Sequence, residues 1–150
     1  MSLTLEIQIA SGEKQLPADE NFMAWGEAAL ARENAGVVIR IVDEEESRRL
    51  NREYRGRDKP TNVLSFPFEA PPEVPSEHLG DLVICAPVVA EEAARQGKPL
   101  QHHWAHMVVH GMLHLQGYDH QNEQEARQME SLERKLLADM AIPDPYSETE

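Results

Sequence analysis

The sequence predicts an α+β fold: a single domain in which a four-stranded mixed β-sheet is covered by about five helices. Its 150 residues are typical of one domain. Short apolar or alternating runs are interleaved with longer stretches of helical period. The connections include hairpin and crossover lengths, so we expect both antiparallel and parallel strand pairs. We expect residues 1–150 to form this domain, with residues 143–150 as a mobile tail.

The first three elements are a strand, a helix and a strand. Apolar residues alternate with polar ones over residues 3–9, a pattern typical of a half-buried strand. Residues 20–33 have helical spacing, and Asp19 can cap the start of this helix. The apolar run at 37–42 predicts the second strand.

The next part of the chain predicts a helix and an edge strand. Asp43 and Glu46 have the spacing of a capping box, which favours a helix from there to about residue 54. Residues 62–68 follow as a third strand, where Pro67 indicates an edge or a bulge. The three prolines of residues 70–76 predict an exposed loop.

The fourth strand and the next helix are marked by their flanking residues. Residues 79–85 form an apolar run that ends at Cys85, which we expect to be buried. Pro87 opens a helix that stops at Gly97, a pairing that helices favour.

Two helices close the chain. The helix at 100–116 is the most apolar, so we expect it at the centre of the domain. The helix at 121–140 is amphipathic. Its expected inward stripe consists of Met129, Leu132, Leu136 and Met140.

Composition excludes several classes of protein. A net charge of −13 argues against generic, charge-driven binding of nucleic acid. No apolar run approaches the roughly 18 residues that span a membrane, and the first residues lack the features of a secretory signal. A lone cysteine agrees with a reducing compartment. We therefore expect a cytoplasmic protein that does not act at a membrane.

One basic segment stands out from the acidic chain. Residues 48–59 hold six basic and two acidic residues, a net charge of +4 that suits local recognition of phosphates. For Arg48, Arg49 and Arg52, a solvated helix face is an equally good interpretation. Arg55 and Arg57 flank Gly56 in an expected loop, which makes them better candidates for a functional role.

The spacing of three histidines predicts a catalytic metal site. His110 and His114 are four residues apart, so they share one face of a helix. Gly117 suits the left-handed turn that ends many helices, and this turn can return His120 as a third imidazole. Three protein ligands with one open position are typical of catalytic zinc, whereas structural zinc takes four.

The other four histidines are weaker candidates. We expect His106 to pack near the site or to support its ligands, and His102 and His103 to lie at a solvated helix start. His78 lies in a loop just before a strand, and we do not expect it to be a ligand.

The histidine spacing matches that of the metalloprotease signature H-E-x-x-H-x-x-G-x-x-H. In those proteases the glutamate is the general base, and here Gly111 occupies its position. Peptide hydrolysis without that base is slow, so we expect a different reaction.

Three segments resemble the YbeY family, bacterial endoribonucleases of ribosomal RNA maturation. They are His110-Gly-Met-Leu-His-Leu-Gln-Gly-Tyr-Asp-His120, Tyr54-Arg-Gly-Arg-Asp-Lys-Pro-Thr-Asn-Val-Leu-Ser-Phe-Pro-Phe68 and Leu79-Gly-Asp-Leu-Val-Ile-Cys85. They follow the family's order, and the resemblance runs from about Leu3 to Tyr146.

The resemblance implies one zinc ion bound by His110, His114 and His120, and a functional arginine at Arg55. It also implies a zinc-dependent, single-strand-specific endoribonuclease that acts in 16S rRNA 3′-end maturation and ribosome quality control. The implied partners are single-stranded RNA, ribosomal RNA, the small ribosomal subunit and an Era-type GTPase.

The residues suggest how such a reaction would run. Zinc-bound water or hydroxide can attack a phosphodiester at neutral pH, with His114 as a catalytic metal ligand. The guanidinium of Arg55 can stabilise the phosphate charge, and Arg57 and Lys59 are further substrate-binding candidates.

Two residues adjoin the third histidine. Tyr118 or Asp119 can hydrogen-bond to a ligand imidazole and fix its tautomer. Alternatively, Asp119 caps the helix that begins near residue 121.

Two other functions stay open. One is a ribosome-assembly binding protein whose zinc is mainly structural, which the missing base and the acidic charge favour. The weaker one is a residual metallopeptidase.

Overall fold

The computed structural model describes residues 2–32, 34–69, 76–119 and 121–146. Most of the expected loop at 70–76 and the histidine at position 120 therefore lie outside the described residues. The elements in chain order are β1 (Ser2–Ala10), α1 (Asp19–Ala28), β2 (Asn34–Val42), α2 (Glu44–Arg55), β3 (Val63–Pro67), β4 (His78–Cys85), α3 (Ala86–Gln96), α4 (Leu100–Leu115) and α5 (Glu123–Asp139).

The four strands form one mixed sheet in the order β1-β2-β4-β3. β2 pairs in parallel with β1 and with β4, whereas β3 pairs antiparallel with β4. β3 is an edge strand, as Pro67 predicted, because a proline has no N–H to donate to a neighbouring strand. The predicted α+β class and the mixed four-stranded sheet are confirmed.

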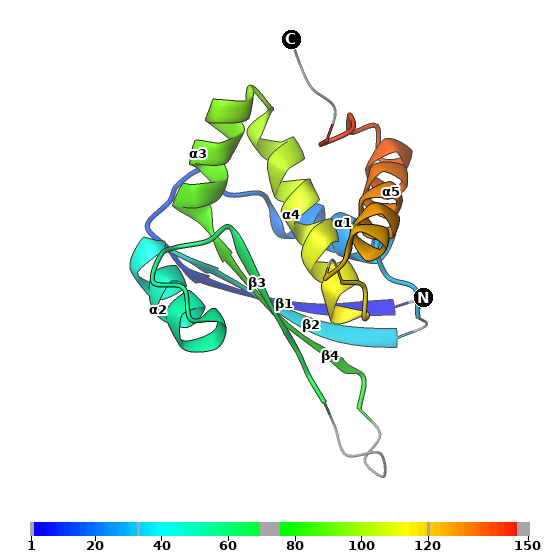
Figure 1. The fold of residues 1–150 in the computed structure, drawn as a ribbon, viewed down its shortest axis with the longest axis horizontal. Coiled ribbons are helices and arrows are strands. Elements are labelled where there is room, and N and C mark those ends of the chain that lie inside the picture. Colours follow the sequence, from blue (N-terminus) through cyan, green and yellow to red (C-terminus); the bar gives the residue numbers. More distant parts are fainter. Residues whose placement is uncertain (1, 33, 70–75, 120, 147–150) are drawn as a thin grey trace.

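The two faces of the sheet are covered by different helices (Figure 1). Side chains alternate between faces along a strand. Leu82 and Ile84 of β4 belong to the main core with α1, α4 and α5. Val83 and Cys85 point the other way and pack in a smaller cluster with Leu50 of α2. The predicted burial of Cys85 is confirmed.

α4 is the central helix, as its apolar sequence predicted. Residues on most sides of it are buried, and it packs against β3, β4, α1, α3 and α5. Burial extends to His103, whose Nε2 lies 2.9 Å from Glu92 Oε1 of α3. The expectation that His103 lies at a solvated helix start was wrong, because α3 folds back over this end of α4.

The helix starts differ in detail from the prediction. Asp19 is the first residue of α1, after an N-cap at Ala18. Asp43 is the N-cap of α2, but its carboxylate accepts hydrogen bonds from the hydroxyl of Ser11 and the amide of Gly12. These donors come from a distant loop, so the local capping pattern did not reveal them.

The start of α5 excludes one of the two roles considered for Asp119. α5 is capped by Asn122, whose side chain accepts a hydrogen bond from the Glu125 amide at 2.8 Å. Asp119 is therefore not the N-cap of this helix.

In the described part of the chain, no helix combines the length and the apolar character needed to cross a membrane.

Candidate metal centre and cleft

Two of the predicted ligands meet on one face of α4. His110 and His114 lie one helical turn apart, and their Nε2 atoms are 3.1 Å from each other. Two nitrogens bound to one tetrahedral zinc, each at 2.0–2.1 Å, would be roughly 3.3 Å apart. The pair is therefore already close to the separation that a shared metal ion requires.

The chain turns sharply after these two histidines. α4 ends at Leu115, and Gly117 adopts a positive φ of 100°. The Tyr118 amide then donates a hydrogen bond to the Leu113 carbonyl at 3.0 Å. The left-handed turn predicted at Gly117 is confirmed, and the position of His120 stays a prediction.

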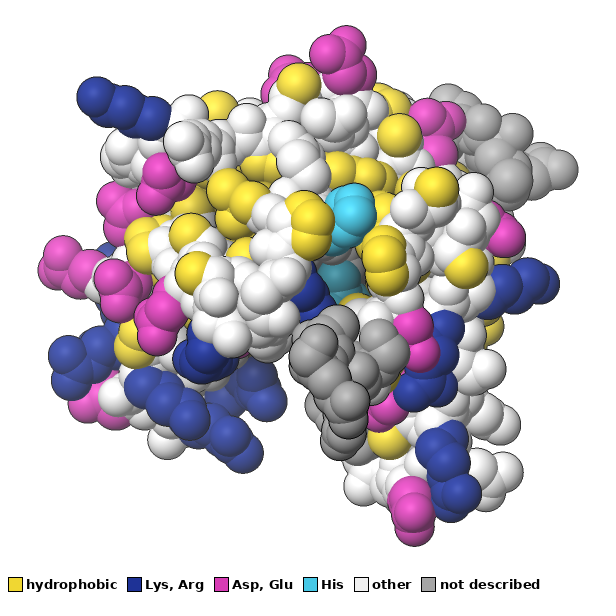
Figure 2. Space-filling model, turned by 90° about the horizontal axis from the view of Figure 1, so that it is seen from above, with side chains coloured by type: hydrophobic (Ala, Val, Ile, Leu, Met, Phe, Trp, Pro, Cys, Tyr) yellow, Lys and Arg dark blue, Asp and Glu magenta, His cyan; other side chains and the backbone are white. Residues whose placement is uncertain are grey.

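The histidine pair lies in a cleft of about 450 Å³. Figure 2 shows histidine side chains in a hollowed part of one face of the molecule, with hydrophobic side chains around them. The cleft is bounded by the end of α2, by β3 and by the segment after α4. Its lining residues are Tyr54, Arg55, Asn62, Val63, Leu64, Ser65, Phe66, His110, His114 and Asp119.

Some of the predicted site residues line this cleft and others do not. Arg55 and Asp119 line it together with the histidine pair. Arg57 and Lys59 are exposed in the loop after α2 and are not among its described lining residues. Tyr118 is 40% exposed and also lies outside that lining.

The arginines of the basic segment divide into two groups. Arg48 and Arg52 lie 2.8 and 3.7 Å from Asp58 Oδ1, so part of their charge is neutralised by a neighbour. Arg55 is exposed and makes no ion pair with any residue that the structure describes. Within the described cleft lining, Arg55 is the cationic side chain that a phosphate could meet.

A buried glutamate, Glu133 of α5, is part of the same centre and was missed by sequence reasoning. It is 0% exposed, and its Oε1 lies 2.5 Å from His110 Nδ1. Its other oxygen lies 3.4 Å from His106 Nε2 and accepts a hydrogen bond from the Tyr146 hydroxyl. The interpretation of His106 as a packing or supporting residue agrees with this position.

Hydrogen bonds from neighbouring side chains set the pKa of the Glu133 carboxyl. Burial alone would raise the pKa of the Glu133 carboxyl, but hydrogen bonds from His106, His110 and Tyr146 bring it down to about 2. Burial lowers the pKa of His106, and burial with the neighbouring carboxylate raises that of Tyr146. These hydrogen bonds therefore favour the ionised form of Glu133, although the side chain is buried.

The cluster is itself able to hold a cation. One ligand atom from each of His106, His110 and Glu133 lies within 4.8 Å of the others, so this group could hold a metal ion. The 2.5 Å separation of His110 and Glu133 is nevertheless a hydrogen-bond distance. It is shorter than the separation of two ligands on one zinc ion.

The sequence contained one signal for Glu133. The fully buried residues of α5 are Met129, Glu133 and Leu137, spaced four apart on one face. The predicted stripe was correct for Met129, while Leu132, Leu136 and Met140 are only partly buried at the edge of the core. An acidic residue in register with two buried apolar ones was therefore the available clue.

The end of the described chain packs near this cluster. Tyr146 forms an edge-on contact with His106 at 5.3 Å between ring centres, and Lys98 donates a hydrogen bond to the Pro145 carbonyl at 2.8 Å. Residues 147–150 lie outside the described part, so the predicted mobility of the tail stays a prediction.

Several known proteins resemble this chain in sequence or in fold. A sequence model of the family described as Endoribonuclease YbeY matches residues 7–141. A protein named Endoribonuclease YbeY, from Halorhodospira halophila (strain DSM 244 / SL1), is 56% identical over 151 residues, which cover 97% of each chain. The solution structure of TM1509 from Thermotoga maritima aligns with a TM-score of 0.56 over 96% of this chain and 99% of that one. At 22% identity, this last likeness concerns the fold alone.

Proposed function

The chain belongs to the endoribonuclease YbeY family, a family of nucleases that hydrolyse RNA, and from this membership we propose that it cleaves single-stranded RNA at a zinc ion. The proposed ligands are His110, His114 and His120. The observation that carries the proposal is the 3.1 Å approach of two imidazole Nε2 atoms in a cleft that Arg55 also lines. We further propose a role in 16S rRNA 3′-end maturation and in ribosome quality control.

The donor set suits zinc. Imidazole nitrogens are preferred zinc ligands, and the described pair is spaced for one ion. Bound in this way, zinc would lower the pKa of a coordinated water to about 7 and supply a nucleophile at neutral pH. The residues of the cleft then have to bind and orient the RNA strand.

Arg55 is proposed to bind the phosphate that is cleaved. It is the last residue of α2, and Gly56 beyond it ends the helix with a φ of 70°. A guanidinium can pair with two phosphate oxygens and offset the charge that grows as the phosphorus is attacked. Asp119, a carboxylate of the same cleft, is placed to orient a ligand imidazole or to accept a proton.

The cleft also suits an unpaired strand. Tyr54 is 70% exposed although it is aromatic, and its ring rests against Phe66 with 4.3 Å between ring centres. Unpaired bases stack on exposed aromatic rings, and each such contact contributes about 1–3 kcal/mol. A single strand could therefore place a base on Tyr54 while its phosphate lies near Arg55.

Replacing Arg55 with alanine is expected to slow RNA cleavage by about 100- to 1,000-fold, the usual effect of losing one group that stabilises developing charge. Metal content should not change, and the melting temperature should stay within about 3 °C because Arg55 is exposed. Arg55→Lys should recover part of the rate, since an ammonium keeps the charge but not the two-pronged geometry. Cleavage of labelled single-stranded RNA and thermal melts measure these effects.

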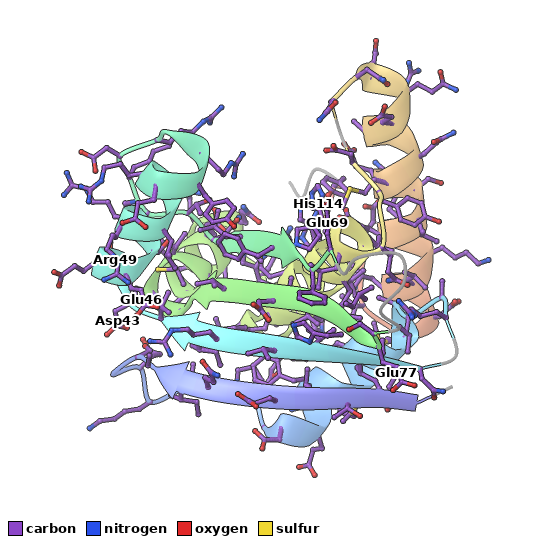
Figure 3. All side chains as sticks on the ribbon, turned by 90° about the horizontal axis from the view of Figure 1, so that it is seen from below. Asp43, Glu46, Arg49, Glu69, Glu77 and His114 are labelled. Carbon is purple, nitrogen blue, oxygen red and sulfur yellow. The ribbon has the colours of Figure 1, made fainter. Side chains whose placement is uncertain are left out.

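Arg49→Ala is the matched control for this experiment. It removes the same charge from the same helix, at a position that Figure 3 shows on the far side of α2 from His114. Its cleavage rate should remain within about threefold of wild type. A large fall in the melting temperature of Arg55→Ala would instead give Arg55 a structural role.

Binding to isolated RNA is expected to be weak and only mildly sensitive to salt. The net charge of −13 opposes RNA, and the basic segment offers about two to four phosphate contacts. Each contact on a single strand contributes a slope of about −0.7, so a log–log plot of affinity against salt should have a slope of about −1.5 to −3. We therefore propose that selectivity comes from docking on the small ribosomal subunit, with an Era-type GTPase as a further partner.

Titrations of single-stranded RNA and of small subunits across salt concentrations test this prediction. Binding to the subunit should be tighter than binding to RNA alone. Tight, steeply salt-dependent binding to RNA with no gain from the subunit would contradict it. Subunit binding that is retained without any RNA cleavage would favour the alternative of an assembly protein with a structural zinc.

A further inference from the structure

Glu133 is an acidic residue in a position that would suit an apolar one. It lies between Met129 and Leu137 on the buried face of α5, and each of the three is at most 1% exposed. A leucine there would continue the stripe, and replacing buried charge by well-packed apolar groups is often neutral or stabilising. Packing therefore does not explain why a carboxylate occupies this position.

The contacts of the carboxylate point toward the metal centre. Glu133 Oε2 already accepts from the Tyr146 hydroxyl, and Oε1 lies 2.5 Å from His110 Nδ1, where a carboxylate oxygen accepts the proton of an Nδ1–H group. In a neutral imidazole with a proton on Nδ1, the lone pair is on Nε2. That atom is the one that lies 3.1 Å from His114 Nε2.

The second oxygen of the Glu133 carboxylate also has hydrogen-bonding neighbours. Its Oε2 accepts a hydrogen bond from the Tyr146 hydroxyl and lies 3.4 Å from His106 Nε2. With both oxygens engaged, it cannot rotate away from His110 without losing a partner. The orientation of His110 is thus determined by a chain of contacts that runs through α5 and the segment after it.

We propose that Glu133 is a positioning residue: it holds His110 in the tautomer and the orientation that present Nε2 to the metal ion, and it does not bind the ion itself. The proposal rests on the metal site proposed above. Carboxylates that hold metal-ligating imidazoles are common, and their loss typically weakens metal binding about 10- to 100-fold. Glu133 would perform this function from a helix that begins after the last of the three histidines.

Metal affinity provides the first test and requires no RNA. Glu133→Gln keeps the shape of the side chain but removes the charge. Competition with a chromophoric chelator should show zinc binding about 10- to 100-fold weaker than in wild type, with one ion still bound at saturation. The cobalt-substituted variant at saturation should keep the wild-type d–d absorption spectrum, because the ligands have not changed.

Glu92→Gln is the matched control. Glu92 and His103 form a second histidine–carboxylate pair on α4, at 2.9 Å, and His103 is also buried. This pair does not line the cleft that holds His110 and His114. Glu92→Gln should leave zinc affinity unchanged, which separates a positioning effect from a general loss of helix packing.

A measurement on the wild-type protein covers the case in which Glu133→Gln does not fold. Long-range ¹H–¹⁵N spectra of the histidine rings should show His110 protonated on Nδ1, in both the metal-free and the zinc-loaded protein. A His110 ring protonated on Nε2 alone in the metal-free protein would overturn the proposal. So would a Glu133→Gln variant whose zinc affinity equals that of wild type.

His106→Gln distinguishes a positioning role from direct ligation. If Glu133 only positions His110, this variant still binds one zinc ion. If it and Glu133→Gln both lose the ion while His114→Ala keeps it, then His106, His110 and Glu133 are the ligands and the proposal is wrong. Failure of wild type to cleave RNA, with zinc affinity lowered in Glu133→Gln, would remove the proposed nuclease mechanism and leave the positioning role intact.

Discussion

Replacing His114 with alanine is expected to abolish both stoichiometric zinc binding and RNA cleavage. Wild type should bind one zinc ion per chain. His114 and His110 are the two proposed ligands that the structure describes, so the variant would retain only part of the proposed three-ligand site. Losing about 4 kcal/mol of metal binding corresponds to roughly a thousandfold weaker affinity. The cleavage rate should fall by at least that factor at zinc concentrations that saturate wild type.

The measurement combines metal analysis after gel filtration with cleavage of labelled single-stranded RNA. His78→Ala is the matched control, because His78 lies on β4, pairs with Asp81 at 3.1 Å and is outside the described cleft lining. All proteins must be purified identically, since contaminating ribonuclease is the obvious artefact. Full zinc occupancy in His114→Ala would remove this residue from the ligand set, and an unchanged cleavage rate would show that cleavage does not depend on the site.

Introducing the peptidase glutamate at Gly111 is expected to destabilise the fold strongly, and not to create a protease. A Cβ atom at Gly111 would lie 2.7 and 2.9 Å from the two methyl carbons of Leu82 on β4. Leu82 is 0% exposed, so the glutamate carboxylate would enter the core without a partner. The cost should exceed about 4 kcal/mol, a large part of the stability of a typical domain.

Gly111→Ala separates the steric effect from the charge. Overpacking by one methyl group costs about 1–3 kcal/mol, and the higher helix propensity of alanine returns about 1 kcal/mol. A net destabilisation of about 0–2 kcal/mol in urea unfolding is therefore expected for alanine. Gln101→Glu, an exposed change on the same helix, should stay within about 0.5 kcal/mol of wild type.

A Gly111→Glu protein that melts near wild type would show that a side chain at position 111 can reach the cleft.

The structure explains why the histidine spacing resembles a protease signature without its base. His110 and His114 face the cleft, whereas Gly111 faces the sheet. On this helix, position 111 is a close-packing position against β4. We therefore expect wild type to show no peptidase activity that depends on His114.

The sequence was a good guide to the helices and strands and to the histidine pair of the candidate metal site. Hydrophobic period and flanking Pro and Gly residues are local signals, so the nine elements that the described residues form were all predicted, with ends that differ by a few residues. The approach of His110 and His114 was predictable for the same reason, because residues four apart in a helix always share a face. The histidine at 120 lies outside the described residues, so the third ligand remains a prediction.

Long-range contacts decided the features that the sequence did not reveal. His103 was expected to be solvated, but α3 places Glu92 against it. Asp43 is the N-cap of α2, but its carboxylate accepts hydrogen bonds from a distant loop and not from its own helix. The charge of Glu133 suggested a solvent-facing residue of an amphipathic helix. Its carboxylate is buried because α4 and the segment after α5 supply three hydrogen-bond donors from positions 13 to 27 residues away. A buried charge is tolerated only where such partners converge, and that convergence is a property of the tertiary structure.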